Sequence, residues 1–199
     1  MHKGGSGMKS KRQNYDSVQS LIIATAARLF TERGADGASL NDIAKAADIA
    51  KGTLYYYYPA KDELIADTAR THGDWMGDTL LAWAETLQRD TDAHKAMKSL
   101  LHELLWDEMH AKLHVVLVSH AAIAGGELSG LMDAMRKKWA LMLEVGSLKL
   151  QSNDARTIRA RSGAFFSMLI GYMAKAEITD ADIDEFIAVS YTHLRAHET

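Results

Sequence analysis

The chain has 199 residues, of which 47% are hydrophobic and 25% charged, a composition that is typical of a folded globular protein and argues against disorder. It contains no cysteine, which excludes disulfides and thiolate metal sites, and no apolar run approaches the ~20 residues of a membrane span. Residues 1–61 carry nine Lys and Arg against five Asp and Glu, whereas residues 62–199 carry fourteen against twenty-one. We therefore expect a cytoplasmic protein with no membrane partner, in which a basic head that suits nucleic acid precedes an acidic body.

The amino-terminal part of the chain begins with a segment that has no apolar pattern. MHKGGSG is rich in glycine, so we expect residues 1–14 to be flexible. Apolar residues at helical spacing then predict a first helix over residues 15–33, formed by Val18, Leu21, Ile22, Ala26, Leu29 and Phe30. Gly34 and Gly37 are expected to end this helix, because glycine is the usual residue at a helix carboxyl terminus.

Two short helices are predicted after these glycines. Ser39 is a plausible N-cap for the segment LNDIAKAA, with Asp42 three residues later in a capping-box position. A tight turn is expected at Asp48, since aspartate tolerates a left-handed backbone better than most residues, and a second short helix begins near Ala50. Two short helices joined by a short turn behind a longer helix form a helix-turn-helix unit, in which the second helix enters the DNA major groove.

The second short helix contains four consecutive tyrosines in the stretch AKGTLYYYYP. Leu54 and Tyr58 are four residues apart and therefore share one face, which we expect to pack inward. Tyr55, Tyr56 and Tyr57 lie on other faces, where their phenols can donate to phosphate oxygens and their rings can lie against sugars or thymine methyl groups. A second interpretation, in which these tyrosines cover a solvent-exposed helix or a protein interface, is less favoured.

Small and basic residues flank the tyrosines. Lys51 and Lys61 bracket the helix and can neutralise phosphates. Gly52 lets the DNA backbone come close, and Thr53 is small enough to reach a base edge. These neighbours favour DNA contact over the plain alternative of an exposed helix.

The remainder of the chain is also predicted to be helical. A long helix is expected over residues 61–88, and further helices over residues 92–110, 112–123, 127–148, 154–176 and 180–188. Gly125-Gly126 and the segment QSND at residues 151–154 are the clearest breaks. We therefore predict an all-α protein with a helix-turn-helix head over residues 15–61 and a helical body over residues 62–188.

The last eleven residues, VSYTHLRAHET over residues 189–199, have no helical apolar stripe of their own. The string is also what a transposon-type sequencing adapter encodes when translated. We expect it to be non-native and the gene to be truncated near Ala188, and we draw no site from its histidines.

The segment LFTERGADGASLNDIAKAADIAKGTLYYYYPAKDEL, residues 29–64, resembles the DNA-binding domain of TetR-family transcriptional repressors. The resemblance implies three amino-terminal helices for DNA, a divergent helical body that binds a small effector, and a homodimer formed through the last two helices. By position, the residues that match DNA contacts of the family are Ser39, Lys51, Gly52, Thr53, Tyr55, Tyr56 and Lys61. Tyr57 lies where His or another polar residue is common. Ala50 replaces the customary Ser or Thr, and Asp48 replaces the common turn Gly.

The body offers candidates for the two other functions that the resemblance implies. Met and Trp residues on apolar stripes can enclose a pocket for an apolar or amphipathic effector, although most of them individually suit an ordinary core. The predicted lining residues are Trp75, Trp83, Met97, Leu101, Trp106, Met109, Met135 and Trp139. Dimerisation is expected over residues 154–188, where small residues allow close helix approach (Ala160, Gly163, Ala164 and Gly171) and larger ones supply contact area (Phe165, Met168, Leu169 and Tyr172). The suspected truncation is expected to weaken this dimer.

The histidines raise the question of a metal site. His110 and His114 have i,i+4 spacing and share a face if the helix is continuous near Ala111. The sequence contains no HExxH motif and no second carboxylate–histidine pair. We therefore predict no metal, no cofactor and no enzymatic activity. The alternative is a helical metal- or ligand-binding protein or enzyme with a helix-turn-helix-like head, and the sequence does not separate a repressor from an activator.

Overall fold

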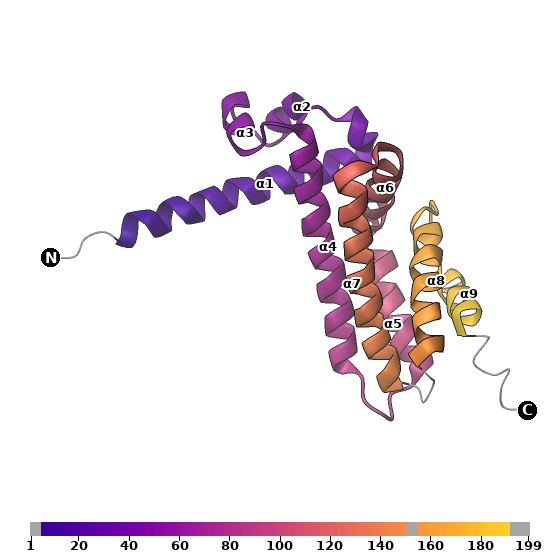
Figure 1. Cartoon of the computed structure of the whole chain (residues 1–199). Coiled ribbons are helices and arrows are strands. Elements are labelled where there is room, and N and C mark those ends of the chain that lie inside the picture. Colours follow the sequence, from indigo (N-terminus) through magenta and orange to yellow (C-terminus); the bar gives the residue numbers. More distant parts are fainter. Residues whose placement is uncertain (1–4, 151–154, 192–199) are drawn as a thin grey trace, which may run out of the picture. The chain divides into compact units, whose positions relative to one another are not determined.

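The computed structural model describes residues 5–150 and 155–191, and within these ranges it contains nine α-helices and no strand. The helices, labelled in Figure 1, are α1 (Gly5–Gly37), α2 (Leu40–Ala46), α3 (Lys51–Tyr57), α4 (Lys61–Thr86), α5 (Ala93–Trp106), α6 (Glu108–Ala124), α7 (Gly126–Leu150), α8 (Ala155–Met173) and α9 (Asp180–Tyr191). The all-α prediction is confirmed. Across the described helices, none combines the length and apolar character needed to cross a bilayer.

The chain divides into two compact units, Met1–Thr71 and His72–Thr199. The boundary falls within α4, ten residues beyond the predicted end of the head at residue 61. The first turns of α4 belong to the first unit, and Leu64, Ile65 and Ala69 in these turns are buried. The predicted non-native tail begins within α9, and its residues 192–199 lie outside the described part of the chain.

Helix α1 begins at Gly5, well before the predicted start at Tyr15. It therefore includes most of the segment that was predicted to be flexible, where KSKRQ supplies residues of good helix propensity. Ile22, Ala26, Leu29 and Phe30 are buried as predicted, whereas Leu21 is 45% exposed. Although the assigned helix runs to Gly37, Gly34 has a φ of 76°, a left-handed conformation that favours glycine, so the regular helix ends there as expected.

The turn structure between α1 and α3 follows the prediction closely. Ser39 Oγ accepts a hydrogen bond from the Asp42 backbone N–H at 3.2 Å, and Asp42 Oδ2 accepts one from the Ser39 N–H at 3.0 Å, which completes the capping box. Hydrogen bonds from Ser39 hold the pKa of Asp42 below its usual value. Asp48 has a φ of 53°, the left-handed geometry expected where glycine is more common.

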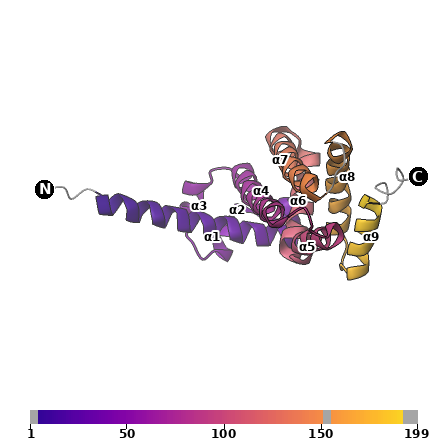
Figure 2. The ribbon, with the colours of Figure 1, turned by 90° about the horizontal axis from the view of Figure 1, so that it is seen from below.

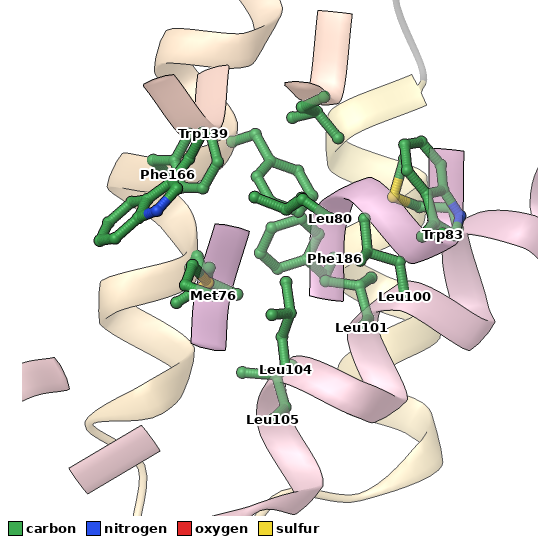
Figure 3. Packing of buried hydrophobic residues seen from close by; sticks show 14 of the residues in the cluster. Met76, Leu80, Trp83, Leu100, Leu101, Leu104, Leu105, Trp139, Phe166 and Phe186 are labelled. Carbon is green, nitrogen blue, oxygen red and sulfur yellow. The ribbon is translucent and has the colours of Figure 1, made fainter. Parts of the chain in front are cut away.

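The second unit has one continuous apolar core to which α4 through α9 contribute. Figure 3 shows the packing of this cluster, which includes four leucines of α5, all at most 3% exposed: Leu100, Leu101, Leu104 and Leu105. Phe186 of α9 lies edge-on to Phe165 of α8, with ring centroids 5.1 Å apart. Figures 1 and 2 show α8 and α9 side by side at the carboxyl-terminal edge of the unit.

Between α4 and α7, two large side chains lie directly against glycines of the facing helix. A Cβ atom on Gly73 of α4 would lie 2.5 Å from Met135 Sδ of α7, and one on Gly146 of α7 would lie 2.2 Å from Trp83 Cζ3 of α4. Trp83 is fixed in turn, because its indole Nε1 donates to the Ala96 carbonyl at 2.8 Å. Each helix thus offers a glycine to a large side chain of the other.

The boundary between α5 and α6 differs from the prediction. The chain breaks at Asp107 rather than between residues 110 and 112, because the Asp107 carboxylate accepts from the His110 backbone N–H at 3.0 Å and caps α6. His110 and His114 consequently lie on one uninterrupted helix. The predicted QSND break falls on residues 151–154, outside the described residues.

Candidate functional site

The inward face of α3 is held by two buried side chains. Leu54 is fully buried and Tyr58, which ends the helix, is 2% exposed. The Tyr58 hydroxyl donates to Asp67 Oδ2 of α4 at 3.0 Å and accepts from Gln19 Nε2 of α1 at 3.1 Å. Burial raises the pKa of Tyr58 to about 12, so the phenol is neutral. The prediction that Tyr58 packs inward is confirmed.

Removing the Tyr58 hydroxyl tests how much its hydrogen bonds to Asp67 and Gln19 contribute to the stability of the protein. Tyr58→Phe is expected to lower the free energy of unfolding by about 1 kcal/mol, because the half-buried Asp67 carboxylate loses a donor. Urea denaturation followed by circular dichroism measures this change. Tyr56→Phe is the matched control, since Tyr56 is 74% exposed and should change stability by less than about 0.5 kcal/mol. Equal stability of the two variants would contradict the role assigned to the hydroxyl.

The outward face of α3 carries most of the predicted DNA-contacting residues. Lys51, Gly52 and Thr53 are exposed, and Tyr55 and Tyr56 are 40% and 74% exposed. Lys51 Nζ lies 5.4 Å from the centroid of the Tyr55 ring, a cation–π arrangement that joins a charge to an aromatic face. Such a surface offers a phosphate-neutralising ammonium, phenolic donors and a small hydroxyl within two helical turns.

Tyr57 differs from its neighbours because it is half-buried. Its ring centroid lies 4.5 Å from that of Tyr15 in α1, and Tyr15 is also 6.4 Å from the Tyr56 ring. Burial raises the pKa of Tyr57. Sequence analysis missed Tyr15 as part of this cluster, although an aromatic residue at the predicted helix start was the available signal. The Tyr57 ring therefore packs partly against Tyr15 of α1.

Two further predicted contacts already have partners within the first unit. The Ser39 hydroxyl bonds to Asp42 in the capping box and remains exposed. Lys61 Nζ donates to the Asp36 carbonyl at 3.2 Å, which connects the start of α4 to the carboxyl-terminal end of α1. Both side chains are placed by local structure, and any contact with DNA would have to share or replace these bonds.

The second unit contains a cavity of about 210 Å³ among α6, α7 and α8. It is lined by His114, Val118, Ala121, Ala122, Ser129, Met132, Asp133, Arg136, Trp139, Phe166 and Ile170. Trp139 is the only one of the eight predicted effector-binding residues in this set. Its indole Nε1 donates to the Gly73 carbonyl at 3.0 Å, so its orientation is fixed and its ring serves as cavity wall.

The other seven predicted lining residues do not gather in one place. Met97 and Leu101 are core residues, at most 3% exposed, whereas Trp106 and Met109 are 51% and 41% exposed. Trp83 and Met135 pack against glycines, as described for α4 and α7. Trp75 stacks on the His110 ring with centroids 3.9 Å apart. These residues are thus distributed among core, surface and helix contacts, and apolar spacing alone does not distinguish a cavity wall from a filled core.

A buried histidine pair lies beside the cavity, and sequence analysis missed its first member. His72 of α4 and His114 of α6 are 2% and 3% exposed, and His72 Nε2 lies 2.9 Å from His114 Nδ1. Burial, together with the neighbouring His114 and His110, lowers the pKa of His72 to about 2, and burial lowers the pKa of His114 to about 4. Within the described residues no group of three His, Asp or Glu side chains is arranged to hold a metal ion.

The residues predicted to form a dimer interface divide between the core and the surface of α8. Phe165 and Leu169 are 3% and 0% exposed, so both side chains are covered by other residues of the same chain. Tyr172 packs edge-on against Phe186 at 5.1 Å, and Gly163 and Met168 are half-buried. The outward face of α8 carries small exposed residues, which are Ala160, Ala164, Ser167 and Gly171.

Comparison with known proteins points to one family. The model of bacterial regulatory proteins of the tetR family matches residues 22–68. The negative transcriptional regulator IcaR of the biofilm operon icaADBC from Staphylococcus aureus (strain Newman) is 25% identical over 147 residues, which are 71% of this chain and 77% of IcaR.

Solved structures share the fold at lower identity. A TetR-family transcriptional regulator from Mesorhizobium loti has a TM-score of 0.68 and 20% identity, with 87% of this chain and 96% of that chain covered. AibR, solved in complex with isovaleryl coenzyme A and operator DNA, has a TM-score of 0.64 and 22% identity, with 86% of this chain and 97% of AibR covered.

Proposed function

Because the chain belongs to the TetR family of transcriptional regulators, we propose that it is a repressor that binds an inverted-repeat operator through α3 and is released by a small effector. The observation that carries the proposal is the division of α3 into two faces. Leu54 and Tyr58 are buried and anchor the inward face of the helix. Lys51, Thr53 and Tyr56 are exposed on its outward face. A helix fixed in this way presents its amino-terminal residues to the major groove.

The relatives support the direction of control and the presence of an effector. IcaR is a negative transcriptional regulator, and AibR has been solved in complex with isovaleryl coenzyme A and operator DNA. In this chain the cavity bounded by Trp139 and His114 is the candidate effector site. We propose that effector binding shifts the protein between two states with different operator affinity, to the extent that the effector binds one state more tightly.

Substitutions on α3 test the operator contact. Lys51→Ala is expected to weaken operator binding and to lower the slope of log affinity against log salt by about one unit, because one phosphate contact is lost. Thr53→Ala is expected to change which operator bases are preferred while leaving the salt slope intact. Operator duplexes are first selected from a random DNA pool. Fluorescence anisotropy with these duplexes and their base-substituted versions, at several salt concentrations, then measures the salt slope and the base preference. Parental binding by both variants would exclude α3 as the recognition helix.

An inverted-repeat operator requires two heads, and we propose that α8 contributes its exposed face of small residues to a homodimer. Ala164→Arg is expected to produce a monomer, because a long charged side chain blocks close helix approach. Sedimentation velocity at micromolar concentration measures the assembly state. Ala124→Arg, on the exposed end of α6, is the control and should sediment like the parent. A parental sedimentation coefficient for Ala164→Arg would place the interface elsewhere.

A further inference from the structure

The histidine pair in the second unit has one unsatisfied atom. His72 Nδ1 is buried and has no hydrogen-bond partner among the described residues. The other nitrogen of the same ring, Nε2, is hydrogen-bonded to His114 Nδ1 at a distance of 2.9 Å. Which ring donates decides whether the unsatisfied Nδ1 carries a proton, because a neutral imidazole has one N–H and one lone pair.

The two possible arrangements differ in cost. If His114 donates, neutral His72 must carry its proton on Nδ1, and a buried N–H is left without an acceptor, which is rare and expensive. If His72 donates through Nε2, its Nδ1 retains only a lone pair. The second arrangement is therefore favoured. His114 then accepts at Nδ1 and carries its own proton on Nε2.

His114 is one of the residues that line the cavity, so Nε2–H is the donor that this side chain can offer to a bound molecule. Burial keeps the pKa of both histidines well below neutrality, and this donor is an uncharged imidazole rather than an imidazolium. A neutral donor in an apolar setting is matched best by an acceptor oxygen on a bound molecule.

The other walls define the body of such a molecule. Trp139 and Phe166, neighbours in Figure 3, have ring centroids 6.0 Å apart and form an aromatic side, and Met132 and Ile170 extend the apolar surface. The charged groups of the lining are already paired, because Arg136 Nη2 lies 2.7 Å from Asp133 Oδ1. At about 210 Å³ the cavity is smaller than the ~300 Å³ at which pockets for drug-sized ligands begin.

We propose that the effector is a compact, uncharged molecule with a flat apolar body and one acceptor oxygen, such as an aromatic ketone or ester, which accepts a hydrogen bond from His114 Nε2. This inference rests on the proposed function, because it assigns a chemical class to the effector. A cationic ligand would find no unpaired anion in the lining, and burying its charge would be costly.

Three probes of similar size test the class on the full chain without DNA. Acetophenone is expected to bind about tenfold more tightly than ethylbenzene, which lacks the oxygen, and more tightly than 1-phenylethylamine, which is a cation at neutral pH. Dissociation constants come from titrations followed by NMR. Ethylbenzene within twofold of acetophenone, a preference for the amine, or no binding of acetophenone would each overturn the proposal. Operator binding is measured separately, so these results leave the repressor assignment untouched.

Two further experiments, a substitution of His114 and a nitrogen NMR spectrum of its imidazole, test whether His114 Nε2–H is the donor. His114→Phe keeps a ring but removes both nitrogens, and it is expected to reduce acetophenone affinity to the level of ethylbenzene. His102→Phe, at a half-buried site on α5 that pairs with Asp180, is the control and should bind like the parent. If His114→Phe does not fold, the imidazole nitrogen spectrum of the parent decides, because the proposal requires His114 protonated on Nε2. A proton on Nδ1 instead would overturn it.

Discussion

Gly146→Ala is expected to lower the free energy of unfolding of the second unit by about 3 kcal/mol, because the new Cβ would lie 2.2 Å from Trp83 Cζ3. Trp83 cannot turn aside freely, since it is 7% exposed and its indole N–H is bonded to the Ala96 carbonyl. The helices must therefore separate or the ring must leave its rotamer. Thermal and urea unfolding of the variant measure this decrease in the free energy of unfolding.

Gly130→Ala on the same helix is the matched control. No heavy atom lies within 4 Å of the position of its Cβ, and the residue is exposed in the interior of α7. Since glycine costs about 1 kcal/mol relative to alanine in a helix, this substitution should be neutral or stabilising. Equal effects of the two glycine substitutions would mean that the Trp83 ring does not pack against Gly146 as described.

Leu54→Ala is expected to destabilise the first unit by about 3 kcal/mol and to abolish operator binding. Leu54 is fully buried on α3, so its truncation leaves a cavity beneath the proposed recognition helix. The short helix has only seven residues and depends on packing rather than on intrinsic propensity. Loss of operator binding should accompany a fall in unfolding midpoint, measured by fluorescence anisotropy and circular dichroism.

Tyr56→Ala separates contact from folding on the same helix. Its side chain is 74% exposed, so the unfolding midpoint should stay close to that of the parent. Operator affinity should nevertheless fall, by about tenfold, if the phenol binds phosphate. A variant that keeps full affinity would remove Tyr56 from the interface, and one that unfolds early would show that its ring packing against Tyr15 and Tyr57 matters more than its exposure suggests.

The head was predictable because its determinants are local. The capping box joins Ser39 to Asp42, three residues apart, and the left-handed turn depends on Asp48 alone. Leu54 and Tyr58 were placed inward from their spacing of four. The partners of Tyr58 were not predictable, since Gln19 and Asp67 are 39 and 9 residues away and meet only when three helices pack.

The body was predictable as a set of helices but not as a site. Phe165 and Leu169 have the spacing of an interface stripe, yet that same spacing suits the core that they enter. His72 carries no motif, and its pairing with His114 depends on how α4 and α6 pack. The walls of a cavity are defined by what packing leaves unfilled, which residue periodicity does not encode.

The reciprocal contacts of α4 and α7 also constrain how the sequence can diverge. Position 146 can enlarge only if position 83 shrinks, and position 73 is tied to position 135 in the same way. Substitutions at these pairs should therefore appear together along a lineage, with a small residue exchanged for a large one on opposite helices. Relatives that carry a bulkier residue at the position of Gly146 are expected to have lost the tryptophan opposite, and this coupled change would mark the same pair of helices even where overall identity is low.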